Sequence, residues 1–144
     1  MRIKLGAAVW DSFHTFSVVR DPYDRAVSSY EFARQRPHLR RHKTAMRRSF
    51  AEFLRAEPDE RMLQYPMLTD PEGGLMVQEV LRHETLSTDL ARMCDRWGLS
   101  ITLPPEPVNA TTRALRDHYL TDETVAIINA RAARDFEMFG YPRR

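Results

Sequence analysis

The chain of 144 residues is 42% hydrophobic and 29% charged, and its formal net charge is +2. These values are ordinary for a soluble globular protein, and we expect residues 1–144 to form a single domain. Cys94 is the only cysteine, which excludes an internal disulfide and a multi-cysteine zinc site. No apolar run approaches the roughly 20 residues of a membrane span. Residues 1–10 lack the long apolar region of a signal peptide, so we predict a cytoplasmic chain.

The first predicted elements form a strand, a tight turn and a helix. Residues 14–20 (HTFSVVR) are rich in β-branched and aromatic side chains, which predicts a short buried strand. Asp21 and Pro22 suit the N-cap and the first position of a helix, which should end before Pro37. Helical spacing predicts one buried face made of Tyr23, Val27 and Tyr30.

A basic stretch follows, and then a region rich in proline and glycine. Residues 34–48 contain seven arginines or lysines and two histidines but no acid. Ser49 and Glu52 have the spacing of a capping box, which predicts a short helix after this stretch. Prolines and glycines predict that residues 58–74 are mainly loop.

The rest of the chain contains a second predicted strand and two predicted helices. Residues 76–82 (MVQEVLR) read as a short strand, and Gly98 suits the C-terminal cap of the helix that follows it. The core face of that helix is predicted to be Leu86, Leu90, Met93 and Trp97, with Cys94 a small buried hydrophobe. Residues 101–107 are an extended connection, and Thr121 caps a last helix. Its predicted buried face is Val125, Ile128, Ala132 and Phe136. Alternating strands and helices predict an α/β fold with a small parallel sheet flanked by helices.

The end of the first predicted strand has the chemistry of an anion site. Ligands of open α/β sheets bind beyond the carboxyl ends of the strands, where Arg20 is placed. Its guanidinium can bind a phosphate through two hydrogen bonds, and the start of the next helix offers free N–H groups. Ser28 lies two turns into that helix and Arg25 lies one turn before Ser28. Geometry alone equally permits Arg20 to pair with a carboxylate and Ser28 to be an ordinary helix serine.

The same stretch, FSVVRDPYDRAVSSY, closely resembles the 3′-phosphate-binding motif of sulfotransferases that use 3′-phosphoadenylyl sulfate (PAPS). It is most similar to the branch that includes the carbohydrate sulfotransferases and their bacterial relatives. Three later segments resemble the same family in the same order: LQYPMLTDPEGGLMVQEVLRHETLSTDLARMCDRWGL, LPPEPVNATT and DHYLTDETVAIINARAARDFEMFGY. The resemblance therefore covers nearly the whole chain.

The resemblance implies a partial P-loop-NTPase-like sulfotransferase fold and transfer of sulfate from PAPS to a hydroxyl or amine, with a carbohydrate as the expected acceptor. Arg20 and Ser28 are implied to hold the 3′-phosphate. Arg25 either supports the same pocket or is structural. Glu84 has the implied role of anchoring its strand to the next helix. No metal-ligand spacing is found, so we expect no metal site.

One family motif is not found before Arg20, namely the lysine-containing loop that holds the 5′-phosphosulfate of PAPS. We therefore expect the chain to represent the C-terminal portion of a sulfotransferase domain. The alternatives are a non-catalytic remnant and a polyanion-binding module that uses the basic stretch. A nucleic-acid patch is disfavoured because no aromatic residue is interleaved there. The catalytic base stays unassigned among five candidates: His14, Glu31, His38, His42 and His118.

Overall fold

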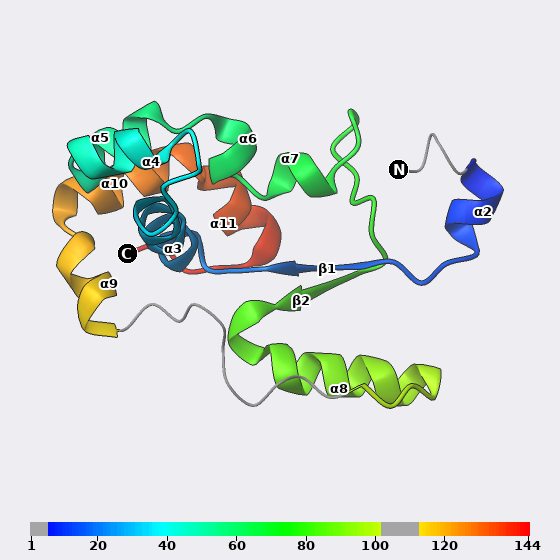
Figure 1. Cartoon of the computed structure of the whole chain (residues 1–144). Helices are drawn as coiled ribbons and strands as arrows, with labels where there is room; N and C mark the ends of the chain where they lie inside the picture. Colours follow the sequence, from blue (N-terminus) through cyan, green and yellow to red (C-terminus); the bar gives the residue numbers. More distant parts are fainter. Residues whose placement is uncertain (1–5, 102–112) are drawn as a thin grey trace.

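The structure is a computed structural model that describes residues 6–101 and 113–144 (Figure 1). Within these ranges, strands β1 (Phe16–Val19) and β2 (Glu79–Arg82) form a two-stranded parallel sheet. Their register pairs Phe16 with Glu79 and Val19 with Arg82, so both strands end at the same edge of the sheet. The predicted α/β class with a small parallel sheet is confirmed, although both strands are shorter than predicted.

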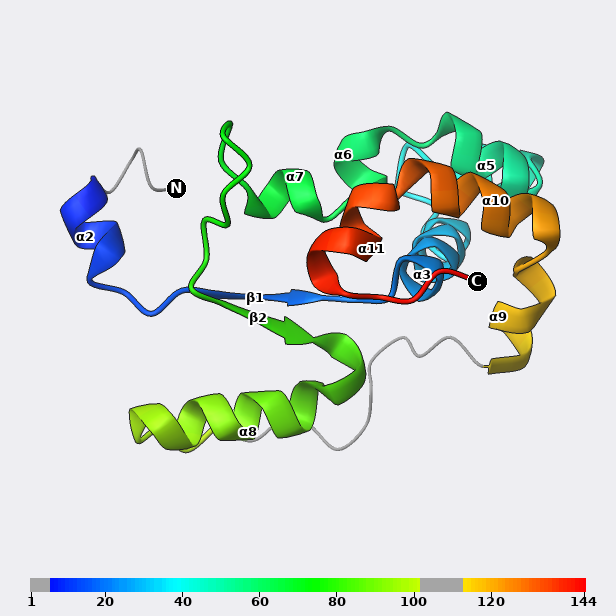
Figure 2. The same cartoon turned by 180° about the vertical axis from the view of Figure 1, so that it is seen from behind.

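Helices lie on both sides of this sheet (Figures 1 and 2). On one side, the 3-10 turn η1 (His83–Thr85) leads from β2 into helix α8 (Leu86–Trp97). The other side begins with α3 (Pro22–Arg34), around which most of the other helices gather. The remaining helices are α2 (Ala7–Asp11), α4 (His42–Arg47), α5 (Phe50–Ala56), α6 (Asp59–Met62), α7 (Tyr65–Leu68), α9 (Arg113–Tyr119), α10 (Asp122–Arg131) and α11 (Ala133–Phe139). No helix in the described ranges is long and apolar enough to span a membrane.

Helix α3 confirms the predicted strand–turn–helix unit. The Asp21 side chain caps it by accepting from the backbone N–H groups of Tyr23 and Asp24 at 2.8 and 3.2 Å. Pro22 occupies the first turn, where its missing N–H costs nothing. The predicted face is buried, and the helix ends well before Pro37. This face packs into the larger core, where the ring of Tyr30 meets those of Phe50, Phe53 and Tyr119.

Helix α8 covers a smaller second core made of Leu81, Leu90, Met93 and Cys94. Cys94 is buried, as predicted, and Gly98 ends the helix in the left-handed conformation with φ of +62°. The prediction for Trp97 is wrong, because its side chain is 54% exposed. The ring centroids of Trp97 and His14 lie 4.4 Å apart. His14 precedes β1, and the four-residue strands end before this point, so within the described ranges no sheet covers the Trp97 ring.

Other features differ from the predictions or lie outside the described residues. Residues 58–74 were expected to be mainly loop, but they contain the single-turn helices α6 and α7, because Pro58 and Pro66 stand at helix starts, where proline is tolerated. The basic stretch contains α4. The predicted last helix is divided into α10 and α11 at Ala132, although Ile128, Ala132 and Phe136 are buried as expected. Most of the connection at 101–107 lies outside the described residues.

Candidate functional site

The turn between β1 and α3, residues 20–22, is held from one side by a buried chain of hydrogen bonds; we call it the Arg20 turn. The Gln64 side chain accepts from the backbone N–H of Arg20 at 2.8 Å and donates to its carbonyl at 2.9 Å. The backbone N–H groups of Gln64 and Tyr65 donate to the carboxylate of Asp135 at 2.9 and 2.8 Å. Asp135 is fully buried. The backbone of Arg20 is therefore fixed by α11 through Gln64.

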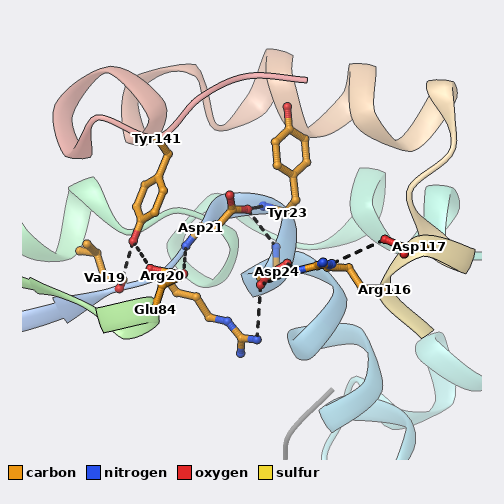
Figure 3. Close-up of polar contacts among 9 residues, drawn as sticks. All are labelled: Val19, Arg20, Asp21, Tyr23, Asp24, Glu84, Arg116, Asp117 and Tyr141. Atoms are coloured by element: carbon orange, nitrogen blue, oxygen red, sulfur yellow. Dashed lines mark hydrogen bonds and ion pairs between the residues drawn. The ribbon is translucent and has the colours of Figure 1, made fainter. Parts of the chain in front are cut away.

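Glu84 holds the turn from the other side (Figure 3). Its carboxylate accepts from the backbone N–H of Asp21 at 2.9 Å and from the hydroxyl of Tyr141 at 2.8 Å. Burial raises the pKa of Glu84, but these hydrogen bonds outweigh it and leave the pKa below its ordinary value. The implied anchoring role of Glu84 is thus visible, with different partners: it ties the end of β2 to the Arg20 turn and to the C-terminal segment.

The side chain of Arg20 leaves this fixed turn with an unused donor. Its guanidinium extends away from Tyr141 toward Asp24 (Figure 3). Nη2 of Arg20 lies 3.9 Å from Oδ2 of Asp24, which is too long for a hydrogen bond. Nε of Arg20 is buried and donates to no acceptor in the part of the chain that the structure describes. Buried donors are normally paired, so this donor, like the equally buried and unbonded Nε of Arg116, is available to an acceptor that the described residues do not supply.

The other two predicted ligands lie differently. Asp24 and Ser28 are four residues apart in α3, so Ser28 lies on the helix face that Arg20 approaches. Ser28 is half-buried, and its hydroxyl makes no hydrogen bond within the described ranges. Arg25 instead donates to the backbone carbonyls of Met62 and Arg61 at 3.2 and 3.1 Å. Burial lowers the pKa of its guanidinium. Of the two interpretations left open for Arg25, these contacts favour the structural one.

The start of α3 does not offer the free N–H groups that the sequence suggested. Pro22 has no N–H, and those of Tyr23 and Asp24 are taken by the carboxylate of Asp21. Burial raises the pKa of Asp21 despite these two hydrogen bonds. An anion at this corner would therefore have to be held by the guanidinium of Arg20 and not by the helix terminus.

Sequence reasoning missed four residues that shape the site: Gln64, Arg116, Asp135 and Tyr141. Arg116 belongs to α9, and its Nη1 donates to both carboxylate oxygens of Asp24 at 3.1 and 3.2 Å. Asp135 and Tyr141 stand in the family-like segment DFEMFGY, so the resemblance contained a signal for them. Gln64 stands at the start of the family-like segment LQYPMLTDPEGG, so the resemblance contained a signal for it as well, whereas Arg116 lies in none of these segments.

Within the described ranges, no hydrogen bond or ion pair joins any of the five candidate bases to Arg20. His14 lies 3.2 Å from the carboxylate of Glu79, and Nδ1 of His42 lies 3.0 Å from the carbonyl of Ala33. Glu31 accepts from the hydroxyl of Tyr119; burial and this bond raise the pKa of Tyr119 to about 12. His118 packs its ring against Tyr119, and His38 is exposed. The described residues also contain no group of three or more side chains that could hold a metal ion.

Comparison with known proteins gives one finding. A family model described as "Sulfotransferase family" matches residues 3–142, which include the Arg20 turn and every residue named around it. No curated protein and no solved structure matches the chain.

Proposed function

Because the chain belongs to the sulfotransferase family, we propose that its Arg20 turn binds the 3′-phosphate of the sulfate donor PAPS, with Arg20 and Ser28 as direct ligands. The observation that carries this proposal is the buried, unbonded Nε of Arg20 on a backbone fixed by Gln64 and Glu84. A phosphate oxygen supplies the acceptor that this donor lacks, and Ser28 can donate to a phosphate that lies along the flank of α3.

The competing interpretation, in which Arg20 simply pairs with a carboxylate, fits the geometry less well. In residues 6–101 and 113–144, Asp24 is the one acid within ion-pair distance of its guanidinium, and the two groups are 3.9 Å apart. The carboxylate of Asp24 is hydrogen-bonded to Arg116 instead. Arg20 therefore keeps its hydrogen-bonding capacity for a ligand, and its partly exposed side chain leaves a path for that ligand.

Members of the sulfotransferase family act on a sulfate donor and an acceptor. In the proposed reaction, the acceptor's hydroxyl oxygen or amine nitrogen bonds to sulfur, the bond from sulfur to the 5′-phosphate oxygen of PAPS breaks, and the acceptor proton passes to a base. Adenosine 3′,5′-bisphosphate then leaves. The Arg20 turn would position the donor by its far end, and positioning alone can lower a barrier substantially. The proposal also includes a carbohydrate hydroxyl or amine as the acceptor and membership of the carbohydrate-sulfotransferase branch. It further includes a single domain and a cytoplasmic location.

Calorimetric titration with two nucleotides tests the proposal. The wild-type chain should bind adenosine 3′,5′-bisphosphate more tightly than adenosine 5′-monophosphate. Arg20→Ala should weaken bisphosphate binding by about 10- to 100-fold, the range expected for hydrogen bonds to a charged group, and should abolish the difference between the nucleotides. Arg92→Ala is the matched control, because Arg92 is an exposed arginine on α8 paired with Asp89. Equal binding by wild type and Arg20→Ala would contradict the proposal, and binding without sulfate transfer would identify a non-catalytic remnant.

A further inference from the structure

Acidic side chains crowd the corner where Arg20 emerges. Asp21 caps α3, Glu84 accepts from the backbone of Asp21, and Asp24 lies one turn into the helix. Burial raises the pKa of Asp21 most, and its two backbone hydrogen bonds lower it. The negative charges of Asp24 and Glu84 raise it further, so these carboxylates repel one another. A phosphate that enters this corner meets the same repulsion, unless the nearest carboxylate is neutralised.

Asp24 is the acid that matters most, because among the residues that the structure describes it is the one within ion-pair distance of Arg20. It can act in two ways. If it is drawn to Arg20, it occupies the guanidinium and repels the phosphate. If another cation holds it, Arg20 stays available.

The distances decide between these two arrangements. Nη1 of Arg116 donates to both oxygens of Asp24 at 3.1 and 3.2 Å, whereas Nη2 of Arg20 remains 3.9 Å away. The hydrogen bond to Asp24 in turn raises the pKa of Arg116. Arg116 comes from α9, 92 residues further along the chain, so this ion pair also docks α9 against the start of α3 (Figure 3). The exposed Asp117 lies 3.7 Å from Nε of Arg116, beyond hydrogen-bonding distance, and does not compete for Nη1.

We propose that Arg116 is a positioning residue of the anion site: it holds and neutralises the carboxylate of Asp24, and so keeps the guanidinium of Arg20 free for the phosphate. This inference rests on the proposed function of the Arg20 turn. It adds a long-range requirement, because the affinity for the donor then depends on the docking of α9.

A double-mutant cycle tests the inference, with adenosine 3′,5′-bisphosphate as the calorimetric probe. Arg116→Ala should weaken binding by about 10-fold, because Asp24 is then free to pair with Arg20. Asp24→Asn alone should bind at least as tightly as wild type, and Asp24→Asn combined with Arg116→Ala should recover to within about threefold of Asp24→Asn. Arg116→Lys, which keeps the charge, should lose less affinity than Arg116→Ala.

The cycle separates this role from a structural one. Both Arg116→Ala and the double variant lack the ion pair, so only the freed carboxylate of Asp24 can make their affinities differ. Unchanged binding by Arg116→Ala would overturn the inference. Weak binding by both Arg116→Ala and the double variant would also overturn it, since Arg116 would then act by direct contact or by packing. If wild type fails to bind the bisphosphate, or Arg20→Ala binds as wild type does, the proposed function itself fails.

Discussion

Arginine side chains are bonded differently in two regions of the molecule, the basic stretch at residues 34–48 and the Arg20 turn. In the basic stretch, the guanidinium of Arg41 bonds to Ser29 and Glu57 at 2.9 and 3.1 Å, and Arg34 lies 3.7 Å from Glu31. Arg36 stacks over the ring of Phe32. In the Arg20 turn, one guanidinium keeps a buried donor without a partner among the described residues.

The difference shows that charge density in the sequence is a poor guide to where an arginine keeps an unpaired buried donor. The Arg41 side chain joins α3 to the end of α5 from the start of α4. The side chains of Arg40, Lys43 and Arg47 are exposed to solvent. An exposed, mobile cation loses rotamer freedom when it binds and is screened by salt. Arg20, in contrast, stands on a backbone that is already fixed, so less freedom remains to be lost.

The largest predicted effect concerns the framework of the Arg20 turn. Asp135→Ala leaves the backbone N–H groups of Gln64 and Tyr65 without their acceptor. Each buried unpaired group costs about 1–3 kcal/mol, so the free energy of unfolding should fall by about 2–5 kcal/mol in urea titrations. Glu137→Ala, on the same helix but exposed, should stay within about 1 kcal/mol of wild type. Equal stabilities of the two variants would show that Asp135 does not support the turn.

Tyr141→Phe should have a smaller effect. The hydroxyl of Tyr141 donates to Glu84, and burial together with this bond raises the pKa of Tyr141. Its loss should lower the free energy of unfolding by about 1 kcal/mol and weaken bisphosphate binding a few-fold, because Glu84 then holds the turn less firmly. Tyr65→Phe is the control, since that hydroxyl makes no hydrogen bond within the described ranges. If both variants behave alike, Glu84 does not depend on Tyr141.

The pH dependence of stability offers a finer test of Glu84. Its folded pKa lies below the ordinary value of 4.5, so its ionised form contributes stability that is present above that value and is lost as the pH falls through the folded pKa. Glu84→Gln should therefore show a shallower loss of stability below about pH 4.5 than wild type. Urea titrations across the acid range would measure the two slopes. Identical slopes would mean that Glu84 is not held as an ion by the turn.

The smallest expected effect on nucleotide binding belongs to the basic stretch. Replacing Arg40, Lys43 and Arg47 by glutamine should change bisphosphate affinity by less than about twofold, because these side chains are exposed. The same variant should elute earlier from a heparin column, where retention follows the number of accessible cations. A large loss of bisphosphate affinity in this variant would reverse the comparison between the two regions.

Much of the local structure could be predicted from the sequence, because its signals are local. The Asp21–Pro22 start of α3, the capping box at Ser49 and Glu52 and the Gly98 cap each depend on residues only a few positions apart. Arg20 and Ser28 were predicted as ligands in the same way, and their binding role stays a prediction.

The contacts that organise the site could not be predicted, because they join distant parts of the chain. Gln64 reaches Arg20 across 44 residues, and Arg116 reaches Asp24 across 92. Local pattern also failed for the start of α3, because it could not show that Asp21 uses the N–H groups that looked available to a phosphate. The family-like segments indicate such contacts only when they are considered together. Arg20, Glu84 and Tyr141 come from three different segments, and the fold brings them to one turn.

The central claim, that the Arg20 turn recognises the 3′-phosphate, is tested most directly by ³¹P nuclear magnetic resonance of adenosine 3′,5′-bisphosphate. A free phosphate monoester loses its second proton near pH 6, and a guanidinium that binds the dianion lowers that pKa. We expect wild type to shift the 3′ resonance and lower its titration midpoint, and Arg20→Ala to remove both changes. A wild-type chain that moves only the 5′ resonance, or an Arg20→Ala variant that still moves the 3′ resonance, would contradict it.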